Sequence, residues 1–204
     1  DQHDERVVCL STRHGAVWGT RPVLRGARWN RSGHLTGHIV DTGGRMDYAE
    51  YVTARRPTLV RTAVLLGCPR ADAEDVVQTA LLRCFRSWRR VIRAAQPEAY
   101  VYRVLVNTLH DVRARRWNGE LPTERLPDRA GDDPDLVTGV AVRHALARMS
   151  TDHREVLVLR YYADLSELET AEVLGIAPGT VKSRTARALT ALAKDPNVSQ
   201  IRSR

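Results

Sequence analysis

ETAEVLGIAPGTVKSRTARAL, residues 169–189, is the stretch of the chain with the most specific pattern. Its apolar residues recur at helical spacing and predict a helix over 166–174, which Gly175 would end because glycine tolerates the left-handed backbone that follows many helices. Pro178 suits the first turn of a second helix, which we expect over 178–192. Two helices joined by a short turn predict a helix-turn-helix.

The second helix of this pair carries polar and cationic side chains on one side, while Val181, Ala188 and Leu192 can face inward. Hydroxyl groups and cations near the start of such a helix are the groups that bind base edges and phosphates in a major groove. An ordinary exposed helix has a similar composition, so the order of glycine, turn and proline carries the prediction. The candidate DNA-binding residues are Thr180, Lys182, Ser183, Arg184 and Arg187.

Residues 46–118 read as three more helices. The first is expected over 47–66, with a kink or break at Pro57 because proline lacks a backbone N–H. The second is expected to begin at Asp72, a good N-cap, and the third at Pro97, continuing to about residue 116. The apolar faces expected to be buried are Tyr48, Val52, Leu59, Ala63 and Leu66 in the first helix, Val77, Leu81, Phe85 and Trp88 in the second, and Val101, Val104, Leu105, Leu109 and Val112 in the third.

The remaining segments differ from these helices. Residues 119–138 contain three prolines and an excess of acids, which predicts an extended acidic linker. Residues 139–194 hold the second helical unit, and 195–204 form a short polar tail. Residues 1–45 lack helical periodicity, so we expect disorder or weak structure there. Because Met46 is the first methionine, we interpret that segment as an upstream extension or a misplaced start rather than a working domain.

Composition limits the function classes further. The 204 residues carry 32 Lys and Arg against 24 Asp and Glu, a net charge of +8, which makes a polyanion the first partner to consider. No stretch approaches the roughly 18 apolar residues of a membrane span, and no signal pattern opens the sequence. We therefore expect a cytoplasmic protein without membrane insertion. The three cysteines are odd in number and widely spaced, which favours neither a disulfide framework nor a paired metal motif.

Three stretches together resemble one family. Residues 169–189, with the GTVKSR core at 179–184, resemble region 4 of bacterial sigma factors of the extracytoplasmic-function class. AEDVVQTAL, residues 73–81, resembles their region 2, and YVYRVLVN, residues 100–107 followed by Asp111, resembles the segment that contacts the minus-ten promoter element. The resemblance covers about residues 47–193 and is strongest to the SigE-like actinobacterial type.

The resemblance implies an all-α fold of two small helical domains, a region 2 three-helix unit (46–118) and a region 4 helix-turn-helix (139–194), joined by the acidic flexible linker. It also implies a sigma factor rather than an enzyme, with no cofactor and no metal site. The implied partners are core RNA polymerase, through its beta-prime coiled coil and beta flap, promoter DNA, and an anti-sigma factor as a further candidate.

The resemblance assigns roles to residues that match the family's motifs. The five candidate residues of the second helix would meet the minus-thirty-five element. Arg103, Asn107 and His110 share one helix side by their spacing, and the loop over 89–96 with Tyr100 and Tyr102 would hold an unstacked base. The candidate minus-ten residues are Tyr100, Arg103, Asn107, His110, Arg113, Arg115 and Arg116, and the candidate polymerase-binding residues are Glu74, Asp75 and Gln78. A helix-capping role for Asp75 is compatible with the same position.

Two other readings stay open at the level of sequence. A stand-alone helix-turn-helix regulator would explain residues 139–193 but would leave AEDVVQ and YVYRVLVN without a role. An all-helical enzyme, with a histidine metal site, is disfavoured because no phosphate loop, HExxH motif or Ser/His/Asp order occurs in the sequence.

Overall fold

The computed structural model describes residues 47–117, 134–196 and 198, together with four short strands nearer the amino terminus. The strands form two antiparallel pairs. In the first, β1 (Leu10–Thr12) pairs with β2 (Gly15–Val17), with Leu10 opposite Val17; in the second, β3 (Arg28–Trp29) pairs with β4 (Leu35–Thr36), with Arg28 opposite Thr36. The weak structure expected over 1–45 otherwise lies outside the described residues, as does the predicted linker up to residue 133.

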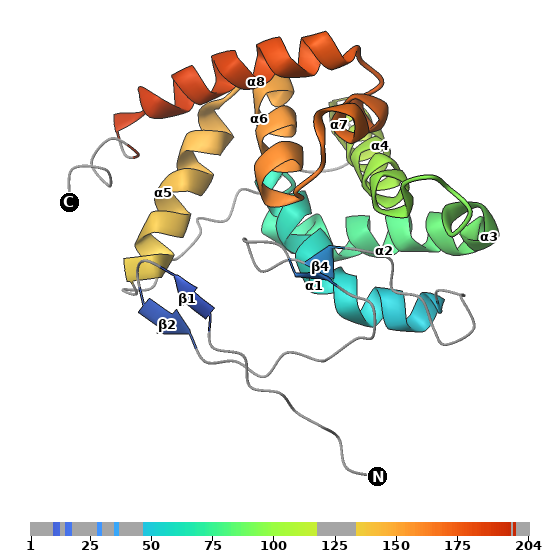
Figure 1. The fold of residues 1–204 in the computed structure, drawn as a ribbon. Helices are drawn as coiled ribbons and strands as arrows, with labels where there is room; N and C mark the ends of the chain where they lie inside the picture. Colours follow the sequence, from blue (N-terminus) through green and yellow to red (C-terminus); the bar gives the residue numbers. More distant parts are fainter. Residues whose placement is uncertain are drawn as a thin grey trace.

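The described chain is otherwise helical, which confirms the predicted all-α fold class (Figure 1). An amino-terminal helical unit comprises α1 (Tyr48–Leu65), α2 (Arg70–Arg86), α3 (Trp88–Val91) and α4 (Pro97–Trp117). A carboxyl-terminal helical unit comprises α5 (Pro134–Arg148), α6 (Thr151–Leu157), the π-helical turn η1 (Val158–Tyr162), α7 (Glu167–Leu174) and α8 (Pro178–Ala193). Within the described residues, no helix combines the length and hydropathy needed to cross a membrane.

Helix α1 begins where the sequence predicts, with the Asp47 side chain accepting a hydrogen bond of 3.3 Å from the Ala49 N–H. The predicted break at Pro57 is wrong, because the helix continues through it. Burial of Arg55 and Leu59 on either side of the proline holds this part of the helix in place. In the first half of α1, Tyr51 faces inward and is 1% exposed. Tyr48, which was expected in that position, is half-buried.

Helix α2 differs from the prediction at both ends. It begins at Arg70, two residues early, with Pro69 at the N-cap and no side-chain cap, so Asp72 lies in the first turn instead of capping it. Phe85 was expected in the core but is 57% exposed, because Cys84 takes the inward position at that turn. The Phe85 ring still lies against Tyr48, with ring centroids 4.8 Å apart.

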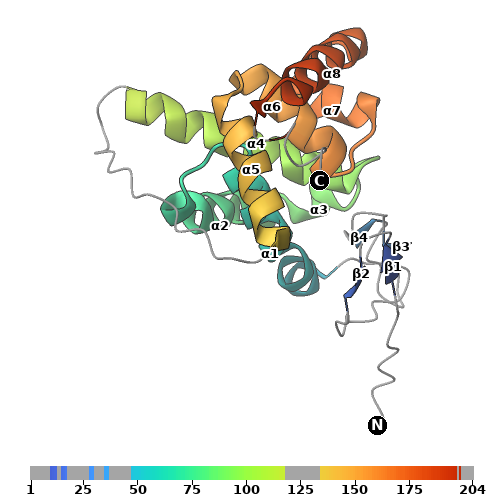
Figure 2. The same ribbon diagram turned by 90° about the vertical axis from the view of Figure 1, so that its left-hand side faces the viewer.

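The two helical units pack against each other, with α4 between them. Helix α4 packs against α2 on one side and against α7 on the other, and α1 contacts both α5 and η1. Buried apolar residues form one continuous cluster from Tyr51 in α1 to Ala188 in α8. Figure 2 shows the resulting order, with α1 and α2 at one end, α8 at the other and α4 in the middle.

One ion pair lies inside the amino-terminal helical unit. The Arg55 guanidinium donates to the Glu98 carboxylate, and their side chains are 5% and 24% exposed. The Tyr51 hydroxyl lies 3.5 Å from the same carboxylate. A buried cation without its counter-ion is costly, so the pair fixes the register between α1 and the first turn of α4.

Glu98→Ala should therefore lower the free energy of unfolding by about 3 kcal/mol, because it leaves Arg55 buried without its carboxylate partner. Glu74→Ala is a matched control, since Glu74 pairs with Arg56 in an exposed bridge of 2.8 Å and should contribute less than about 1 kcal/mol. Urea unfolding followed by circular dichroism measures both. Equal effects of the two substitutions would contradict a structural role for the buried pair.

Candidate nucleic-acid interface

The helix-turn-helix forms as predicted, with well-defined local caps. Ser166 and Glu169 make a reciprocal capping box at the start of α7, with hydrogen bonds of 2.7 and 3.2 Å. Gly175 ends α7 in the left-handed conformation, at φ 65°, where a side chain would be strained. Pro178 opens α8, and Ala177 before it supplies no side-chain cap. The turn is therefore set by Gly175 and Pro178 rather than by a capped second helix.

Helix α8 is anchored by its apolar side and leaves its cations outside. Val181 and Ala188 are fully buried, and α8 packs across α6 and α7. Lys182 and Arg187 are exposed. Thr180 and Ser183 are half-buried, and the Ser183 hydroxyl donates to the Thr180 carbonyl at 3.1 Å.

Arg184 is the candidate on α8 that forms an ion pair with another helix. Its guanidinium lies 2.8 Å from the Asp152 carboxylate in the first turn of α6, and the two side chains are 28% and 58% exposed. A partly exposed pair of this kind contributes little to stability. Its arginine can therefore exchange the carboxylate for another anion. Asp152 therefore orients the Arg184 guanidinium and leaves it available to a phosphate.

A cavity of about 430 Å³ lies beside the short helix α3. It is lined by Arg89, Arg90, Arg93, Ala94 and Tyr100. The Tyr100 hydroxyl lies 3.5 Å from the Ser87 hydroxyl, which holds the ring at the cavity wall. An aromatic ring surrounded by arginines is suited to a stacked base and its phosphate. The loop and Tyr100 are thus brought together as the sequence predicted.

Tyr102 does not belong to that cavity, and its predicted place there is wrong. Its side chain is 1% exposed, and burial raises its pKa to about 12. Position 102 lies two residues from Tyr100, so the helical turn directs it to the opposite side of α4, into the core.

The other minus-ten candidates lie along α4 in three different environments. Arg103, Asn107 and Arg115 are exposed. His110 and Arg113 are held in a polar network with the carboxyl-terminal helical unit. The Arg116 backbone is helical, but its side chain lies outside the described residues.

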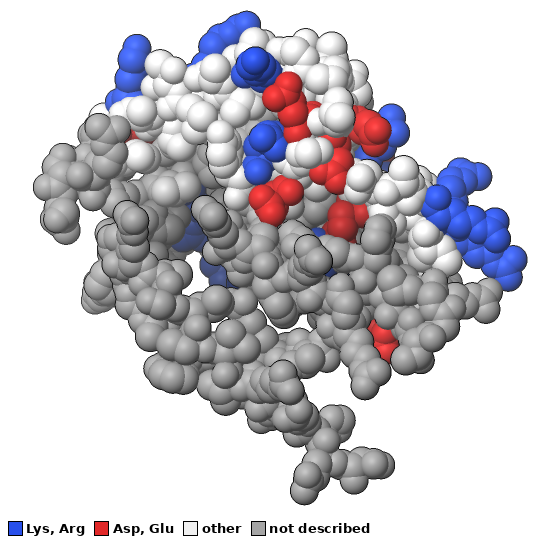
Figure 3. Space-filling view, in the orientation of Figure 1, with Lys and Arg blue, Asp and Glu red and all other residues white. Residues whose placement is uncertain are grey.

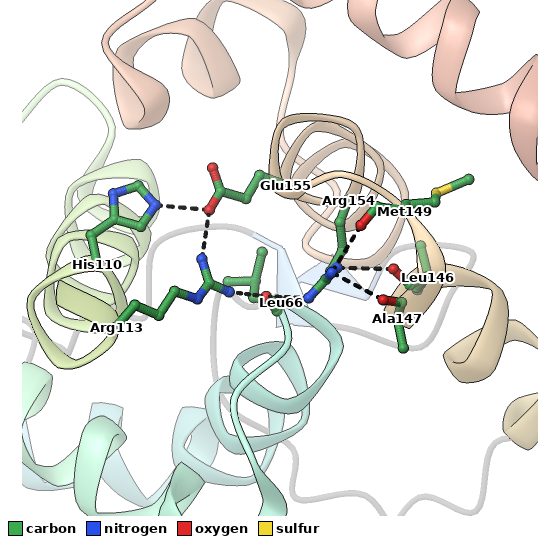
Figure 4. A network of polar contacts seen from close by, with 8 residues as sticks. All are labelled: Leu66, His110, Arg113, Leu146, Ala147, Met149, Arg154 and Glu155. Carbon is green, nitrogen blue, oxygen red and sulfur yellow. Dashed lines mark hydrogen bonds and ion pairs between the residues drawn. The ribbon is translucent and has the colours of Figure 1, made fainter. Parts of the chain in front are cut away.

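That polar network, shown in Figure 4, centres on Glu155 of α6. Glu155 is 6% exposed, and one of its oxygens lies 2.8 Å from His110 Nε2 and 3.2 Å from Arg113 Nη1. Arg113 also donates to the Leu66 carbonyl at the end of α1. Glu155 was not predicted from the sequence, since its only local signal is an acid next to the apolar run VLVL.

Arg154, the neighbour of Glu155, joins three helices. Its Nη1 lies 3.4 Å from the same Leu66 carbonyl. Its other nitrogens donate to the carbonyls at the end of α5, namely Leu146 at 2.9 Å, Ala147 at 3.3 Å and Met149 at 3.0 Å. Burial, together with the nearby Arg113, lowers the pKa of Arg154. Two arginines thus converge on one helix-end carbonyl at the junction of the two helical units.

The candidate polymerase-binding residues share the outer face of α2. Glu74, Asp75 and Gln78 are all exposed, and Glu74 accepts from Arg56 at 2.8 and 3.1 Å. Because α2 begins at Arg70, Asp75 is beyond the first turn, so its predicted capping role is wrong. The same face continues from Gln78, at steps of four and three residues, to two exposed apolar side chains that were not predicted to lie there: Leu82, 60% exposed, and Phe85.

Charges are segregated on the visible surface (Figure 3). Lys and Arg side chains gather along the edge formed by α8 and again at the end of the molecule near α3, and Asp and Glu, with further basic side chains among them, lie between these two groups. On this face, acidic side chains therefore lie between the two basic groups. Among the residues described, no cluster of three or more His, Cys, Asp or Glu is placed to bind a metal.

Comparison with known families identifies both helical units. The Sigma-70 region 2 model matches residues 51–119, and the Sigma-70 region 4 model matches residues 139–192. RNA polymerase sigma-E factor from Streptomyces avermitilis is 36% identical over 155 residues, covering 75% of this chain and 87% of that protein. The ECF RNA polymerase sigma factor SigM from Mycobacterium tuberculosis is 31% identical over 172 residues, covering 83% and 87%.

Solved structures share the arrangement of helices. The sigma factor RpoE in complex with the anti-sigma factor NepR, from Bartonella quintana, superposes with a TM-score of 0.61 at 24% identity, covering 72% of this chain and 95% of that one; this similarity concerns the fold. CnrH in complex with the cytosolic domain of CnrY superposes with a TM-score of 0.51 at 25% identity, covering 72% and 84%.

The Glu155 contact should be visible in the titration of His110. The hydrogen bond to Glu155 raises the pKa of His110, although partial burial and Arg113 oppose it. The contact therefore stabilises the fold fully below the ordinary histidine pKa of about 6.5 and loses this effect as the pH rises through the raised value. In an NMR titration, Glu155→Gln should lower the pKa of His110.

Asp195→Asn is the matched control for this titration, since Asp195 pairs with Arg148 at 2.6 Å inside the carboxyl-terminal helical unit. It removes the same charge and should leave the pKa of His110 unchanged. A His110 pKa that does not respond to Glu155→Gln would exclude the contact in solution.

Proposed function

Because the chain belongs to the extracytoplasmic-function class of the sigma-70 family, whose members are not enzymes but direct RNA polymerase in transcription initiation, we propose specific surfaces for promoter DNA and polymerase. The observation that carries this proposal is the pair of basic surfaces, one on α8 and one around α3 (Figure 3), on a single continuous apolar core. Two basic surfaces suit two promoter elements on one DNA molecule.

Helix α8 binds the minus-thirty-five element in this proposal. Its exposed Lys182 and Arg187 supply phosphate or base contacts, and Arg184 exchanges Asp152 for DNA. Thr180 and Ser183 lie at the start of the helix, which is the part that enters a major groove in helix-turn-helix proteins. The support is the burial of Val181 and Ala188, which fixes the opposite side of α8 against the protein.

The cavity beside α3 and the exposed side of α4 bind the minus-ten element. Opening a duplex requires at least one base to leave its stack, and an aromatic wall with nearby cations compensates for the lost stacking. Tyr100 and the three arginines of the cavity provide this combination. The residues that continue this surface along α4 are Arg103, Asn107, His110, Arg113, Arg115 and Arg116.

The outer face of α2 docks on the beta-prime coiled coil of core polymerase. Glu74, Asp75 and Gln78 provide polar contacts, and the exposed Leu82 and Phe85 provide apolar area on the same face. An interface of this mixed character is typical of protein partners, since a buried apolar centre needs a polar rim. The carboxyl-terminal helical unit meets the beta flap, and an anti-sigma factor competes for these surfaces, as the complex of RpoE with NepR suggests by analogy.

Run-off transcription tests the proposed function. The template is the DNA directly upstream of the protein's own coding region, and the components are the purified chain and actinobacterial core RNA polymerase. A discrete transcript that requires both components is expected. Sequence-specific DNA binding by the chain alone, without any transcript, would favour the stand-alone regulator instead.

Reciprocal substitutions separate the two surfaces. Arg184→Ala combined with Arg187→Ala should abolish promoter binding by the holoenzyme while polymerase capture persists, because only cations on α8 are removed. Asp75→Arg should abolish polymerase capture, because it changes the sign of charge on the outer face of α2, while the cations of α8 that bind DNA are left in place. Electrophoretic mobility shift and polymerase pull-down measure the two properties. Loss of polymerase capture by the α8 double variant, or undiminished capture by Asp75→Arg, would show that the surfaces are misassigned.

A further inference from the structure

The carboxyl end of α4 carries an aromatic side chain that belongs to none of the surfaces proposed so far. Trp117 is the last residue of the helix and is 92% exposed. Among the large hydrophobic side chains in the part of the chain that the structure describes, it is the most exposed. The ring of Trp88, by contrast, packs against Tyr48 and Tyr51, with ring centroids 5.1 and 5.3 Å apart. A single exposed apolar side chain is common, so the surroundings of Trp117 decide what it can bind.

Helical spacing aligns Trp117 with the exposed side of α4. Steps of three and four residues lead from Tyr100 to Trp117 along one side of the helix. This stripe consists of Tyr100, Arg103, Asn107, His110, Ala114 and Trp117. Tyr100 is half-buried at the wall of the cavity beside α3, and the other five residues are exposed. The stripe therefore begins and ends with an aromatic ring and has polar side chains between the two rings.

The surroundings of Trp117 are cationic. Residues 112–117 contain three arginines and no acid, and Arg115 is exposed. Asp111, the nearest preceding acid, is paired with Arg83 at 2.8 Å. In Figure 2 this end of α4, drawn in yellow-green, extends past the helices that it packs against. An exposed aromatic ring with guanidinium groups nearby is the combination that binds unpaired bases and their phosphates.

The distance between the two aromatic rings limits the shape of the ligand. A helix rises 1.5 Å per residue, so Tyr100 and Trp117 lie about 25 Å apart along the axis of α4. A single strand of several nucleotides spans this distance, and sites of about 4–16 nucleotides are usual for proteins that bind single strands. A duplex offers no free base face to either ring, because its bases are stacked on one another. The stripe therefore fits a single strand.

We propose that Trp117 is a second base-stacking site, which binds an unpaired nucleotide of the same DNA strand whose extruded base enters the cavity at Tyr100. The indole ring provides the stacking surface, and Arg115 contacts a phosphate. Every base has a face that can stack, so the site holds the opened strand without reading its sequence. This inference rests on the minus-ten role proposed for α4.

Binding of a single-stranded probe to the full-length chain tests the inference directly. The probe is a fluorescently labelled oligothymidylate of about 12 nucleotides, and anisotropy measures its affinity across a range of salt concentrations. Trp117→Leu should weaken binding about tenfold, because it removes the stacking surface but keeps an apolar side chain. Trp117→Tyr keeps an aromatic face and should bind within about threefold of the unsubstituted chain. Equal losses in the two variants would overturn the proposal.

The salt dependence separates stacking from phosphate contacts. Trp117→Leu should leave the slope of affinity against salt unchanged, since it removes no cation. Arg115→Gln should reduce this slope by about 0.7, the value for one phosphate contact on a single strand. An unchanged slope in Arg115→Gln would overturn the assigned phosphate contact.

Two controls test whether the effect is specific to Trp117 and to single strands. Leu168→Ala removes another exposed apolar side chain, 66% exposed on α7, and should leave the affinity for oligothymidylate unchanged. A duplex probe of the same length should bind Trp117→Leu as well as it binds the unsubstituted chain. An equal loss of affinity for duplex and single strand would overturn the stacking site. Circular dichroism should show the same helix content in all variants, because Trp117 is outside the core.

Tryptophan fluorescence reports the stacking itself. Unlabelled oligothymidylate should quench the fluorescence of the unsubstituted chain and of Leu168→Ala more strongly than that of Trp117→Tyr, which retains the other three tryptophans. The same fractional quenching in all three proteins would overturn the proposal, because the bound strand would then lie away from Trp117.

Run-off transcription with the same proteins separates this inference from the proposed function. Transcripts from the unsubstituted chain, together with undiminished affinity of Trp117→Leu for oligothymidylate, would overturn the second stacking site alone. Loss of polymerase capture by Trp117→Leu with that affinity undiminished would instead assign Trp117 to a protein partner. Absence of transcripts from the unsubstituted chain would overturn the proposed function, whatever the affinity for oligothymidylate.

A template with a mismatched, already open minus-ten region gives the final comparison. Trp117→Leu should reduce transcription from a fully paired template, because the opened strand is held less firmly. It should reduce transcription less from the mismatched template, in which the second strand cannot re-pair. Equal reductions on the two templates would overturn a role of Trp117 in holding the opened strand.

Discussion

The position of α4 between the two helical units is the constraint on which the rest of the structure depends. One side of this helix is buried against α2, another packs against α7, and a third stays exposed. A helix with three such environments places Tyr102 in the core, Arg103 in solvent and His110 in an ionic network, all within eight residues of one another. The candidate minus-ten surface is the part of α4 that is not buried against α2 or α7.

The basic charge of the chain has two physical uses in this arrangement. Arginines that meet a carboxylate or a carbonyl inside the fold, such as Arg55 and Arg113, hold helices together. Arginines on α3 and α8 remain at the surface, where the acids between them keep the two basic areas distinct (Figure 3). Composition therefore indicates the class of partner, whereas position decides which arginines are available to it.

Prediction succeeded where the signal was local. The helix predicted over 166–174, its end at the left-handed Gly175 and the start of α8 at Pro178 depend on the conformations of single residues and their nearest neighbours, so the helix-turn-helix was predictable. Where several neighbours compete for one helix face, prediction failed. Tyr51 replaced Tyr48 on the inward face of α1, and Phe85 stayed outside because Cys84 filled the core.

The sequence by itself determined the helical class, the order of the two family regions and the residue types on α8 and around α3, because helical periodicity, turn residues and short motifs are properties of neighbouring positions. Only the tertiary structure decided which face of each helix is buried and that Glu155 meets His110 and Arg113. These partners are 45 and 42 residues apart along the chain. No local pattern encodes such a contact, since it depends on how two separately predictable units pack together.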